Sequence, residues 1–188
     1  MIDWQKQYKE NKTPWNYDKL DDDLDKFFKN KSKKKTILDL GCGDGSQSFF
    51  LQKQGFKVKS TDIVKQLKYK LKDFMKDDIL KSKLDGKFDY VIDRGLLHNI
   101  VVSPDIMNYL NTLKDITKKG SEILLKVLSP YEIRFHHLAK ESGPFRFTEK
   151  QLENVYGDKF KLKSMIDTYY YCNMKPHLRA YFCVYKRV

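Results

Sequence analysis

The glycine-rich turn within ILDLGCGDGSQSFFL, residues 37–51, restricts the fold of this chain more than any other feature. An apolar run enters the turn, and an amphipathic helical pattern leaves it. Gly41, Gly43 and Gly45 let a ligand approach the backbone closely, because side chains at these positions would clash with it. A strand, a glycine turn and a helix in this order predict a nucleotide-binding element.

Strands and helices alternate after this turn. An earlier helix is predicted at 19–28, and the basic run 29–35 joins it to the first strand. Residues 117–120, TKKG, carry the lysines and the glycine that are typical of a helix C-terminus. The alternation predicts a mostly parallel sheet with helices on both faces. We predict strands at 36–40, 57–62, 73–76, 88–93 and 122–128, and helices at 46–54, 64–72 and 104–117.

The pattern changes towards the end of the chain. Thr148 and Gln151 form a capping box, which predicts a helix that begins there and ends at Gly157. Two segments rich in aromatic and branched residues follow, at 160–171 and 179–187. These two strands are too close together for a parallel crossover, so we expect an antiparallel hairpin.

The composition is that of one globular domain, with 188 residues of which 40% are hydrophobic and 14% aromatic. The formal net charge of +12 is typical of proteins that bind nucleic-acid phosphates, and it makes RNA a candidate partner. However, only five of the 37 basic residues are arginine, and the lysines are spread along the chain. Charge alone therefore favours a solvated surface over a dedicated RNA-binding face.

The cysteines and the apolar runs indicate the compartment. Cys42, Cys172 and Cys183 form no CxxC pair, and together with His177 they show no known metal-ligand spacing. We expect reduced thiols and no metal centre. The first residues lack the apolar segment of a secretory signal, and no run approaches the roughly 18 apolar residues of a membrane helix. We therefore expect a soluble, cytoplasmic protein with no membrane partner.

The spacing of the turn distinguishes between nucleotide classes. G-x-G-x-G places the third glycine one position earlier than the G-x-G-x-x-G of dinucleotide folds. Asp39 lies within the first strand, two residues before Gly41. Asp62 ends the second strand, where a carboxylate can accept hydrogen bonds from both hydroxyls of a ribose.

These motifs together resemble a known family. ILDLGCGDG, followed by STDI, KDDIL, FDYVIDRGLLHNI and the C-terminal hairpin, is similar to class I S-adenosylmethionine-dependent methyltransferases from residue 36 to the end of the chain. The resemblance implies an α/β, Rossmann-like, seven-stranded, mostly parallel sheet, and S-adenosyl-L-methionine as the cofactor. It implies one domain, 1–188, with an N-terminal cap and helix (1–35), a cofactor-binding half (36–128), and a lid loop and hairpin (129–188).

The resemblance also implies roles for individual residues. The backbone from Gly41 to Gly45, including Cys42, would wrap the methionine part of the cofactor, and Asp39 would support its amino group. The remaining residues would each contact one part of the cofactor. Asp62 would bind the ribose, Ile63 would pack against the adenine, and Asp78, or else Asp77, would bind the adenine amine. Ile79 would pack on the adenine ring, and Asp93 and Arg94 would face the methionine end.

The segment WQKQYKENKTPWN, residues 4–16, resembles the N-terminus of the thiopurine, thiocyanate/halide and tellurite-resistance group of small-molecule methyltransferases. By that resemblance Trp15 and Tyr8 would line the site, and the acceptor would be a small molecule with sulfur or another soft atom. The alternative is that Trp4 and Trp15 only pack an N-terminal helix.

His98 lies five residues after Asp93, at the rim where acceptors sit in an open α/β sheet. It is a candidate general base or acceptor contact, alongside Asp93 and Arg94, and a packed structural histidine is the alternative. The long connection 129–147 predicts a lid, part of which could be a short helix. Its residues His136, His137, Arg134 and Arg146 either touch an anionic acceptor or lie on the surface.

Two other functions stay open at the level of sequence. Lys126 and Asp93 could belong to the Lys-Asp-Lys-Glu tetrad of RNA ribose 2′-O-methyltransferases, but the last strand lacks the glutamate of that tetrad. Cap-type RNA methylation and protein-lysine methylation are further alternatives, the latter weakly indicated by DRGLL. A non-enzymatic cofactor-binding partner is a third class, which the retained Asp39, Asp62 and Asp78 argue against.

Overall fold

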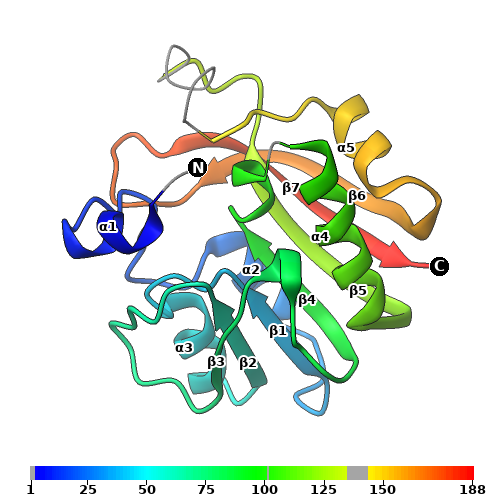
Figure 1. Ribbon diagram of the computed structural model, residues 1–188, viewed down its shortest axis with the longest axis horizontal. Coiled ribbons are helices and arrows are strands. Elements are labelled where there is room, and N and C mark those ends of the chain that lie inside the picture. The colour runs from blue at the N-terminus through cyan, green and yellow to red at the C-terminus, as the bar shows by residue number, and fades with distance from the viewer. Residues whose placement is uncertain (1–2, 101, 135–143) are drawn as a thin grey trace.

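Seven strands form one sheet in the order β3-β2-β1-β4-β5-β7-β6 in the computed structural model of the chain (Figure 1). The structure describes residues 3–100, 102–134 and 144–188. The strands are β1 Thr36–Leu40, β2 Lys57–Asp62, β3 Phe74–Lys76, β4 Phe88–Arg94, β5 Thr117–Leu128, β6 Phe160–Tyr170 and β7 Leu178–Arg187. The helices are α1 Trp4–Lys9, α2 Asp22–Phe28, α3 Ser46–Lys53, α4 Ser103–Asp115 and α5 Glu149–Tyr156, with 3₁₀ turns η1 Ile79–Lys81, η2 Leu97–Asn99 and η3 Gly157–Lys159.

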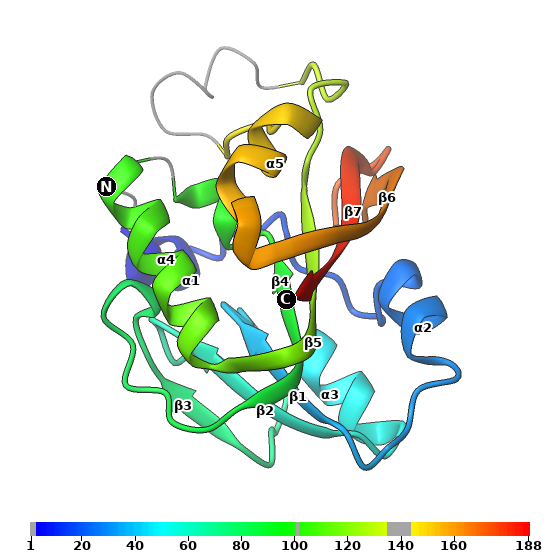
Figure 2. The same ribbon diagram turned by 90° about the vertical axis from the view of Figure 1, so that its right-hand side faces the viewer.

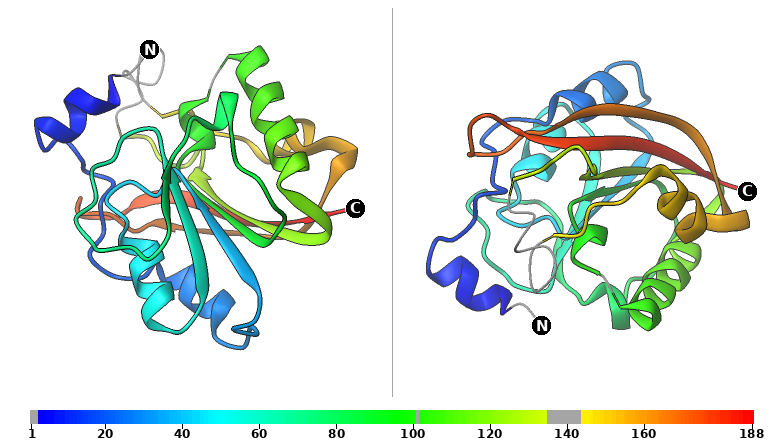
Figure 3. Two further views of the ribbon diagram at one scale, coloured as in Figure 1. Left: turned by 60° about the horizontal axis from the view of Figure 1, so that its bottom comes forward. Right: turned by 90° about the horizontal axis from the view of Figure 1, so that it is seen from above.

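The first five strands of this sheet are parallel, and the last two pair antiparallel. In the register of the central strands, Asp39 of β1 lies between Ser60 of β2 and Ile92 of β4. Strand β7 inserts antiparallel between β5 and β6, and β6 and β7 run side by side along the sheet edge (Figure 3). The predicted Rossmann-like sheet with an antiparallel C-terminal hairpin is confirmed.

Helices cover both faces of the sheet. Figure 2 shows α4 and α5 on one face and α2 and α3 on the other. Neighbouring residues of the central strands are buried on opposite faces: Val91 packs in the core beneath α4 and α5, whereas Ile92 packs in the core beneath α2 and α3. The strands read as continuous apolar runs for this reason, as expected of a parallel sheet covered on both faces.

The capping box at the start of α5 is confirmed. The Thr148 hydroxyl accepts a hydrogen bond from the Gln151 amide at 3.2 Å, and the Gln151 side chain accepts one from the Thr148 amide at 2.8 Å. The helix ends at Gly157, as predicted. Within the described part of the chain, none of the helices is long and apolar enough to cross a membrane.

Two predicted helical features are wrong. Residues 64–72 form bends rather than a helix, because tertiary contacts hold this segment against the glycine turn. The Lys68 amide donates to the carbonyl of Asp44 at 2.9 Å, and Leu71 packs against Gly45. The TKKG segment starts β5 rather than ending a helix, since Thr117 already pairs with Phe88 in the sheet. Helix α2 also begins at Asp22, three residues later than expected.

A candidate cofactor cleft at the glycine turn

A cleft opens where the glycine turn leaves β1. Its volume is about 30 Å³, which is the space of a single water molecule. The residues that line it come from the turn, from the start of α3, from the N-terminal segment and from the ends of β4 and β6. They are Trp15, Asn16, Asp39, Gly41, Cys42, Gly43, Asp44, Ser46, Gln47, Arg94 and Tyr170.

Gly43 is the point of closest approach within the turn. Its φ of +60° lies in the left-handed region, and a Cβ there would stand 3.3 Å from the Tyr8 hydroxyl. A side chain at this position would therefore be strained and would also push against the segment above it. Because glycine has no side chain, the backbone of residue 43 stays accessible to a ligand that binds between the turn and Tyr8.

Asp39 is fully buried at the floor of the cleft. Its carboxylate accepts a hydrogen bond from the Ser48 hydroxyl at 2.6 Å, and that hydroxyl accepts one from Ser60 at 2.7 Å. Burial raises the pKa of Asp39 to about 7. A cation beside a carboxyl group with a pKa near 7 stabilises the ionised form of that group. The amino group of a methionine moiety would be such a cation.

Asp62 connects the end of β2 to the glycine turn. One carboxylate oxygen accepts from the Gly43 amide and the other from the Val64 amide, both at 2.9 Å. Burial raises the pKa of this carboxyl. Ile63, the next residue, is 45% exposed and offers an apolar surface beside it. The carboxylate keeps unused lone pairs that can accept ribose hydroxyls.

In the loop after β3, Ile79 does not lie where the resemblance implies, which is against the adenine ring of the cofactor. Asp77 accepts from the Ser82 hydroxyl at 2.7 Å and from the Lys83 amide at 2.8 Å, so it holds its own turn. Asp78 caps η1 through the Leu80 amide. Ile79 is buried in the core beneath α4. Neither Asp78 nor Ile79 is among the described residues that line the cleft.

Asp93 does not enter the cleft, in contrast to the expectation that it faces the methionine end. It is fully buried on the α4 side of the sheet and accepts from the amides of Leu96 and Leu97 at 2.8 and 3.1 Å. The Tyr109 hydroxyl donates to it at 2.8 Å. Burial raises the pKa of Asp93 to about 6. Its role in the described structure is to hold the turn after β4.

Arg94, the next residue, does reach the cleft wall. Its guanidinium donates to Asp21 at 3.0 Å and stacks over the Tyr170 ring at 4.4 Å. Asp21 and Asp23 also hold the buried Lys126 ammonium, with a distance of 2.7 Å to Asp23. The N-terminal segment is therefore fastened to the sheet by a buried ion-pair network.

Sequence reasoning missed this network, although a signal was present. Three successive aspartates, residues 21–23, cap and open α2, and a single lysine interrupts the apolar run of β5. A lysine buried in a strand needs a carboxylate partner, and this run supplies two. The network also separates Lys126 from Asp93, because Lys126 lies on the α2 face and Asp93 bonds Tyr109 on the α4 face. The two cannot act together as members of one tetrad.

His98 is buried behind the cleft wall. The Leu128 amide approaches its Nδ1 at 3.5 Å, and its ring lies 5.8 Å from that of Tyr170. Burial, with the nearby Arg94 charge, lowers the pKa of His98 to about 3. The imidazole is therefore neutral at physiological pH and is not among the described residues that line the cleft. This placement matches the packed, structural alternative rather than the general base.

An aromatic roof covers the glycine turn. The Trp15 ring lies edge-on to Trp4 at 5.7 Å and to Tyr8 at 5.9 Å between ring centroids. Of the three, Trp15 lines the cleft, and the Tyr8 hydroxyl stands over Gly43. Burial raises the pKa of Tyr8, so its hydroxyl stays protonated. We name Trp4, Tyr8 and Trp15 the aromatic roof.

The predicted lid is described only at its two ends, since residues 135–143, with His136 and His137, lie outside the described residues. Arg134 forms an ion pair with Glu132 at 2.7 Å and donates to the carbonyls of Pro176 and His177. Arg146 donates to the carbonyls of Glu132 and Arg134. Both guanidinium groups fasten the ends of this connection to the chain, so they are not directed at an acceptor.

Comparison with known proteins gives one family match and many fold matches. The sequence model of the methyltransferase domain family matches residues 12–169. No curated protein matches the chain. A methyltransferase from Anabaena variabilis, described as dependent on S-adenosylmethionine, has a TM-score of 0.72 and 21% identity, covering 98% of this chain and 93% of its own.

Two further structures share the fold. A TehB-like methyltransferase from Corynebacterium glutamicum has a TM-score of 0.68 and 13% identity over 98% of this chain and 96% of its own. The 1,6-didemethyltoxoflavin-N1-methyltransferase of Burkholderia thailandensis, with 1,6-didemethyltoxoflavin and S-adenosylhomocysteine bound, has a TM-score of 0.72 and 16% identity over 99% of this chain and 86% of its own. At these identities the similarity is one of fold.

Proposed function

The chain belongs to the methyltransferase domain family, with S-adenosylmethionine as its methyl donor, and on this premise we propose that it methylates a small nucleophile held beneath the aromatic roof. The observation that carries the proposal is the position of Trp15 and Tyr8 over the glycine turn. A roof of this kind encloses a small acceptor, whereas a polymer needs an open groove. The proposal includes a cytoplasmic location, supported by three buried, free cysteines.

The residues at the glycine turn fit the cofactor chemically. Asp39, which lines the cleft, and Asp62, which binds the Gly43 amide but is not among the described lining residues, offer carboxylates to an amino group and to ribose hydroxyls, as the family resemblance implies. Asp44 adds a buried carboxylate oxygen that has no hydrogen-bond partner within the described part of the chain. A nucleoside-sized ligand is larger than the cleft, so the proposal includes an outward shift of the roof on binding.

We propose that the protein promotes methyl transfer by aligning the donor with the acceptor and by excluding water from the site. When bound, S-adenosylmethionine would supply a methyl group on a positively charged sulfur, and this methyl group would pass to an in-line nucleophile while the sulfur leaves as a neutral thioether. The roof residues Tyr8 and Trp15 keep water from this centre, and the Arg94 side chain forms part of the wall. The buried network of Asp21, Arg94 and Lys126 holds this side chain in place and compensates its charge.

A soft or already ionised acceptor fits this arrangement best. A general base must titrate near the working pH and reach the acceptor, and the buried, neutral His98 meets neither requirement. Asp93 is fully engaged with backbone amides and Tyr109. Thiols and halide-like anions need little or no help with deprotonation, which agrees with the resemblance of residues 4–16 to the thiopurine and thiocyanate/halide group.

The structural neighbours support a small acceptor only by analogy. The toxoflavin enzyme acts on a heterocycle, and another neighbour, of TM-score 0.72, is described in connection with converting a disulfide bond into a thioacetal group during echinomycin biosynthesis. RNA is the weaker candidate, although the net charge of +12 favours it. Lys126, the lysine that a ribose 2′-O-methyltransferase would need, is held by Asp21 and Asp23.

The test is the formation of S-adenosylhomocysteine with single acceptors. Small thiols, iodide and total RNA are each offered with S-adenosylmethionine at low and at high ionic strength. The proposal predicts turnover with a small thiol or halide that depends little on salt. Turnover only with RNA, falling steeply as salt rises, would contradict it, because phosphate binding is salt-dependent.

A further inference from the structure

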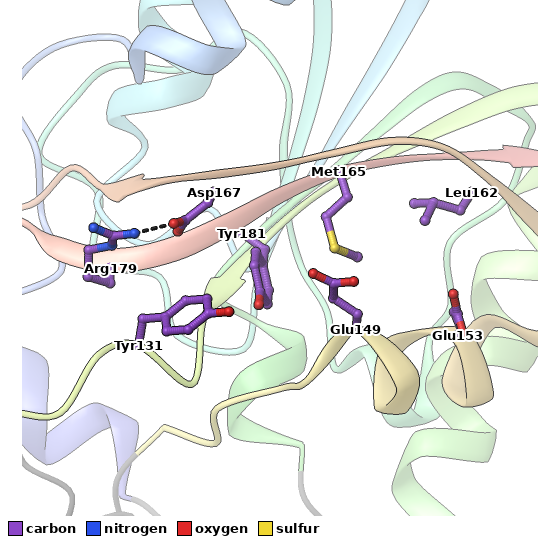
Figure 4. Close-up of a pocket in the computed structure, with 8 residues that line it drawn as sticks. All are labelled: Tyr131, Glu149, Glu153, Leu162, Met165, Asp167, Arg179 and Tyr181. Atoms are coloured by element: carbon purple, nitrogen blue, oxygen red, sulfur yellow. Dashed lines mark hydrogen bonds and ion pairs between the residues drawn. The ribbon is translucent and has the colours of Figure 1, made fainter.

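A second cavity lies between α5 and the β6–β7 hairpin (Figure 4). Its volume is about 370 Å³, within the usual range of small-molecule sites of roughly 300–1,000 Å³. It shares no lining residue with the cofactor cleft. Tyr181 and Met165 reach it from the α5 face of the sheet, whereas Lys126 and Arg94 lie on the α2 face. The function proposed above does not use this cavity.

Two tyrosine rings form a corner of the cavity. Tyr131 and Tyr181 meet nearly at right angles, with 6.4 Å between ring centroids and 81° between ring planes. Tyr131 is a large aromatic residue, yet it is 62% exposed. Met165 adds a polarisable thioether beside Tyr181 (Figure 4). Ring faces carry negative electrostatic potential, so a corner of two rings attracts a cation.

The charge of the lining is negative, in contrast to the net charge of +12 of the whole chain. Glu149 and Glu153 lie one helical turn apart on α5 and both line the cavity. Among the described residues, the glutamates found in ion pairs are Glu10, Glu122 and Glu132, so neither of these two is paired. Like charges at this spacing destabilise a helix. The cationic Arg179 is neutralised by its ion pair with Asp167. The two glutamates therefore leave the cavity with an uncompensated negative charge.

We propose that this cavity binds a small organic ammonium ion. Such a ligand satisfies the three features at once: its charge lies between the carboxylates of Glu149 and Glu153, and its alkyl groups pack on the tyrosine rings and on Met165. An anion would be repelled by the glutamates. A neutral apolar molecule would leave those carboxylates without a partner. This inference is independent of the proposed acceptor chemistry.

The test uses choline as the probe and its uncharged isostere 3,3-dimethylbutan-1-ol as the control ligand. With ¹³C-methyl methionine in the full chain, the Met165 signal reports on the cavity and the Met174 signal on the core patch that includes Trp15 near the cleft. The proposal predicts a saturable shift of the Met165 signal with choline only. An unmoved Met165 signal, an equal response to the neutral isostere, or a response confined to Met174 would overturn it.

Variants separate the charge from the rings. Glu153→Gln and Tyr131→Leu are each expected to weaken choline binding about fivefold to tenfold, the scale of one partly exposed cation contact. Tyr131→Phe keeps the ring and should keep the affinity. Asp158→Asn removes an exposed carboxylate of η3 outside the cavity, so it controls for net charge. Equal weakening by Asp158→Asn and Glu153→Gln would show a non-specific charge effect and overturn the proposal.

Discussion

Asp62 is the residue on which the cofactor assignment depends most. Its carboxylate accepts from the Gly43 and Val64 amides and keeps lone pairs for a ribose. We predict that Asp62→Ala weakens S-adenosylmethionine binding by about 1–3 kcal/mol, the scale of a hydrogen-bond site with a charged partner. Isothermal titration calorimetry measures the loss directly.

Asp77→Ala is the matched control for this substitution. Asp77 is also an aspartate near a strand end, but its carboxylate is bound to Ser82 and Lys83 within its own turn. The cofactor affinity should therefore stay close to that of the unchanged chain. Unchanged affinity in Asp62→Ala, or an equal loss in both variants, would mean that the ribose site lies elsewhere.

Asp39 makes cofactor binding depend on pH. Burial raises its pKa to about 7, so the group is protonated below that pH and ionised above it. Only the ionised form attracts a cationic amino group. The cofactor affinity should therefore rise as pH increases towards 7, by up to about tenfold per unit well below the pKa. Calorimetry across this range checks the slope.

Asp39→Asn provides the control because its amide does not titrate. Its affinity should be low and nearly flat over the same pH range. A slope that survives in this variant would assign the titration to another group, such as Asp62, whose pKa burial also raises. For the fold, the sign is opposite: the raised pKa of Asp39 makes its contribution to stability fall as pH rises through about 7.

At the scale of elements, the turn between β4 and η2 leaves no room for a side chain at residue 95. Gly95 has a φ of +89°, and a Cβ there would clash with the Tyr170 hydroxyl and lie 3.0 Å from His98 Nε2. We predict that Gly95→Ala lowers the free energy of unfolding by about 1–3 kcal/mol, through backbone strain and overpacking. Urea denaturation measures this change.

A second substitution separates the two causes. Tyr170→Phe removes the hydroxyl that a Cβ on residue 95 would meet, together with its hydrogen bond to the Arg94 carbonyl. Gly95→Ala should therefore cost less stability in the Tyr170→Phe background than in the unchanged chain. Equal costs in both backgrounds would indicate that the backbone conformation alone requires the glycine.

The aromatic roof reports on the cleft through its two tryptophans, the only ones in the chain. Trp15 lines the cleft, whereas Trp4 contacts Trp15 from outside it. We predict that S-adenosylmethionine changes the tryptophan fluorescence of the unchanged chain and of Trp4→Phe. The change should disappear in Trp15→Phe. A response that follows Trp4 instead would show that the roof does not face the cofactor.

At the scale of the whole molecule, strand order and hairpin direction followed from local rules. Continuous apolar runs predict a covered parallel sheet, and the short connection after Tyr170 requires an antiparallel partner for β6. The prediction of a helix at 64–72 was wrong, because the tertiary contacts of this segment with Asp44 and Gly45 outweigh its helical pattern. Propensity is a weak guide where long-range contacts decide.

The residues of the cleft were predicted less completely than the fold. Asp39 and the glycines are read from a local motif, because they lie in one strand and in the turn that follows it, whereas Trp15 is read from the resemblance of residues 4–16. Tyr170 arrives from a distant strand and carries no motif of its own, and Gln47 lies just after the turn, at the start of α3, where nothing in the motif marks it as a lining residue. Whether Asp93 and His98 face the cleft or the core depends on which face of the sheet they occupy, which a short motif does not specify.

The measurement that tests the whole account most directly is the fate of a labelled methyl group. Methyl-labelled S-adenosylmethionine is offered to the protein with three pools together: small thiols and halides, total RNA, and cell protein. We predict label in a volatile or soluble product, and we expect Trp15→Ala to reduce the amount of this label. Label that precipitates with RNA or protein, or no transfer to any pool, would contradict a small-molecule site beneath the aromatic roof.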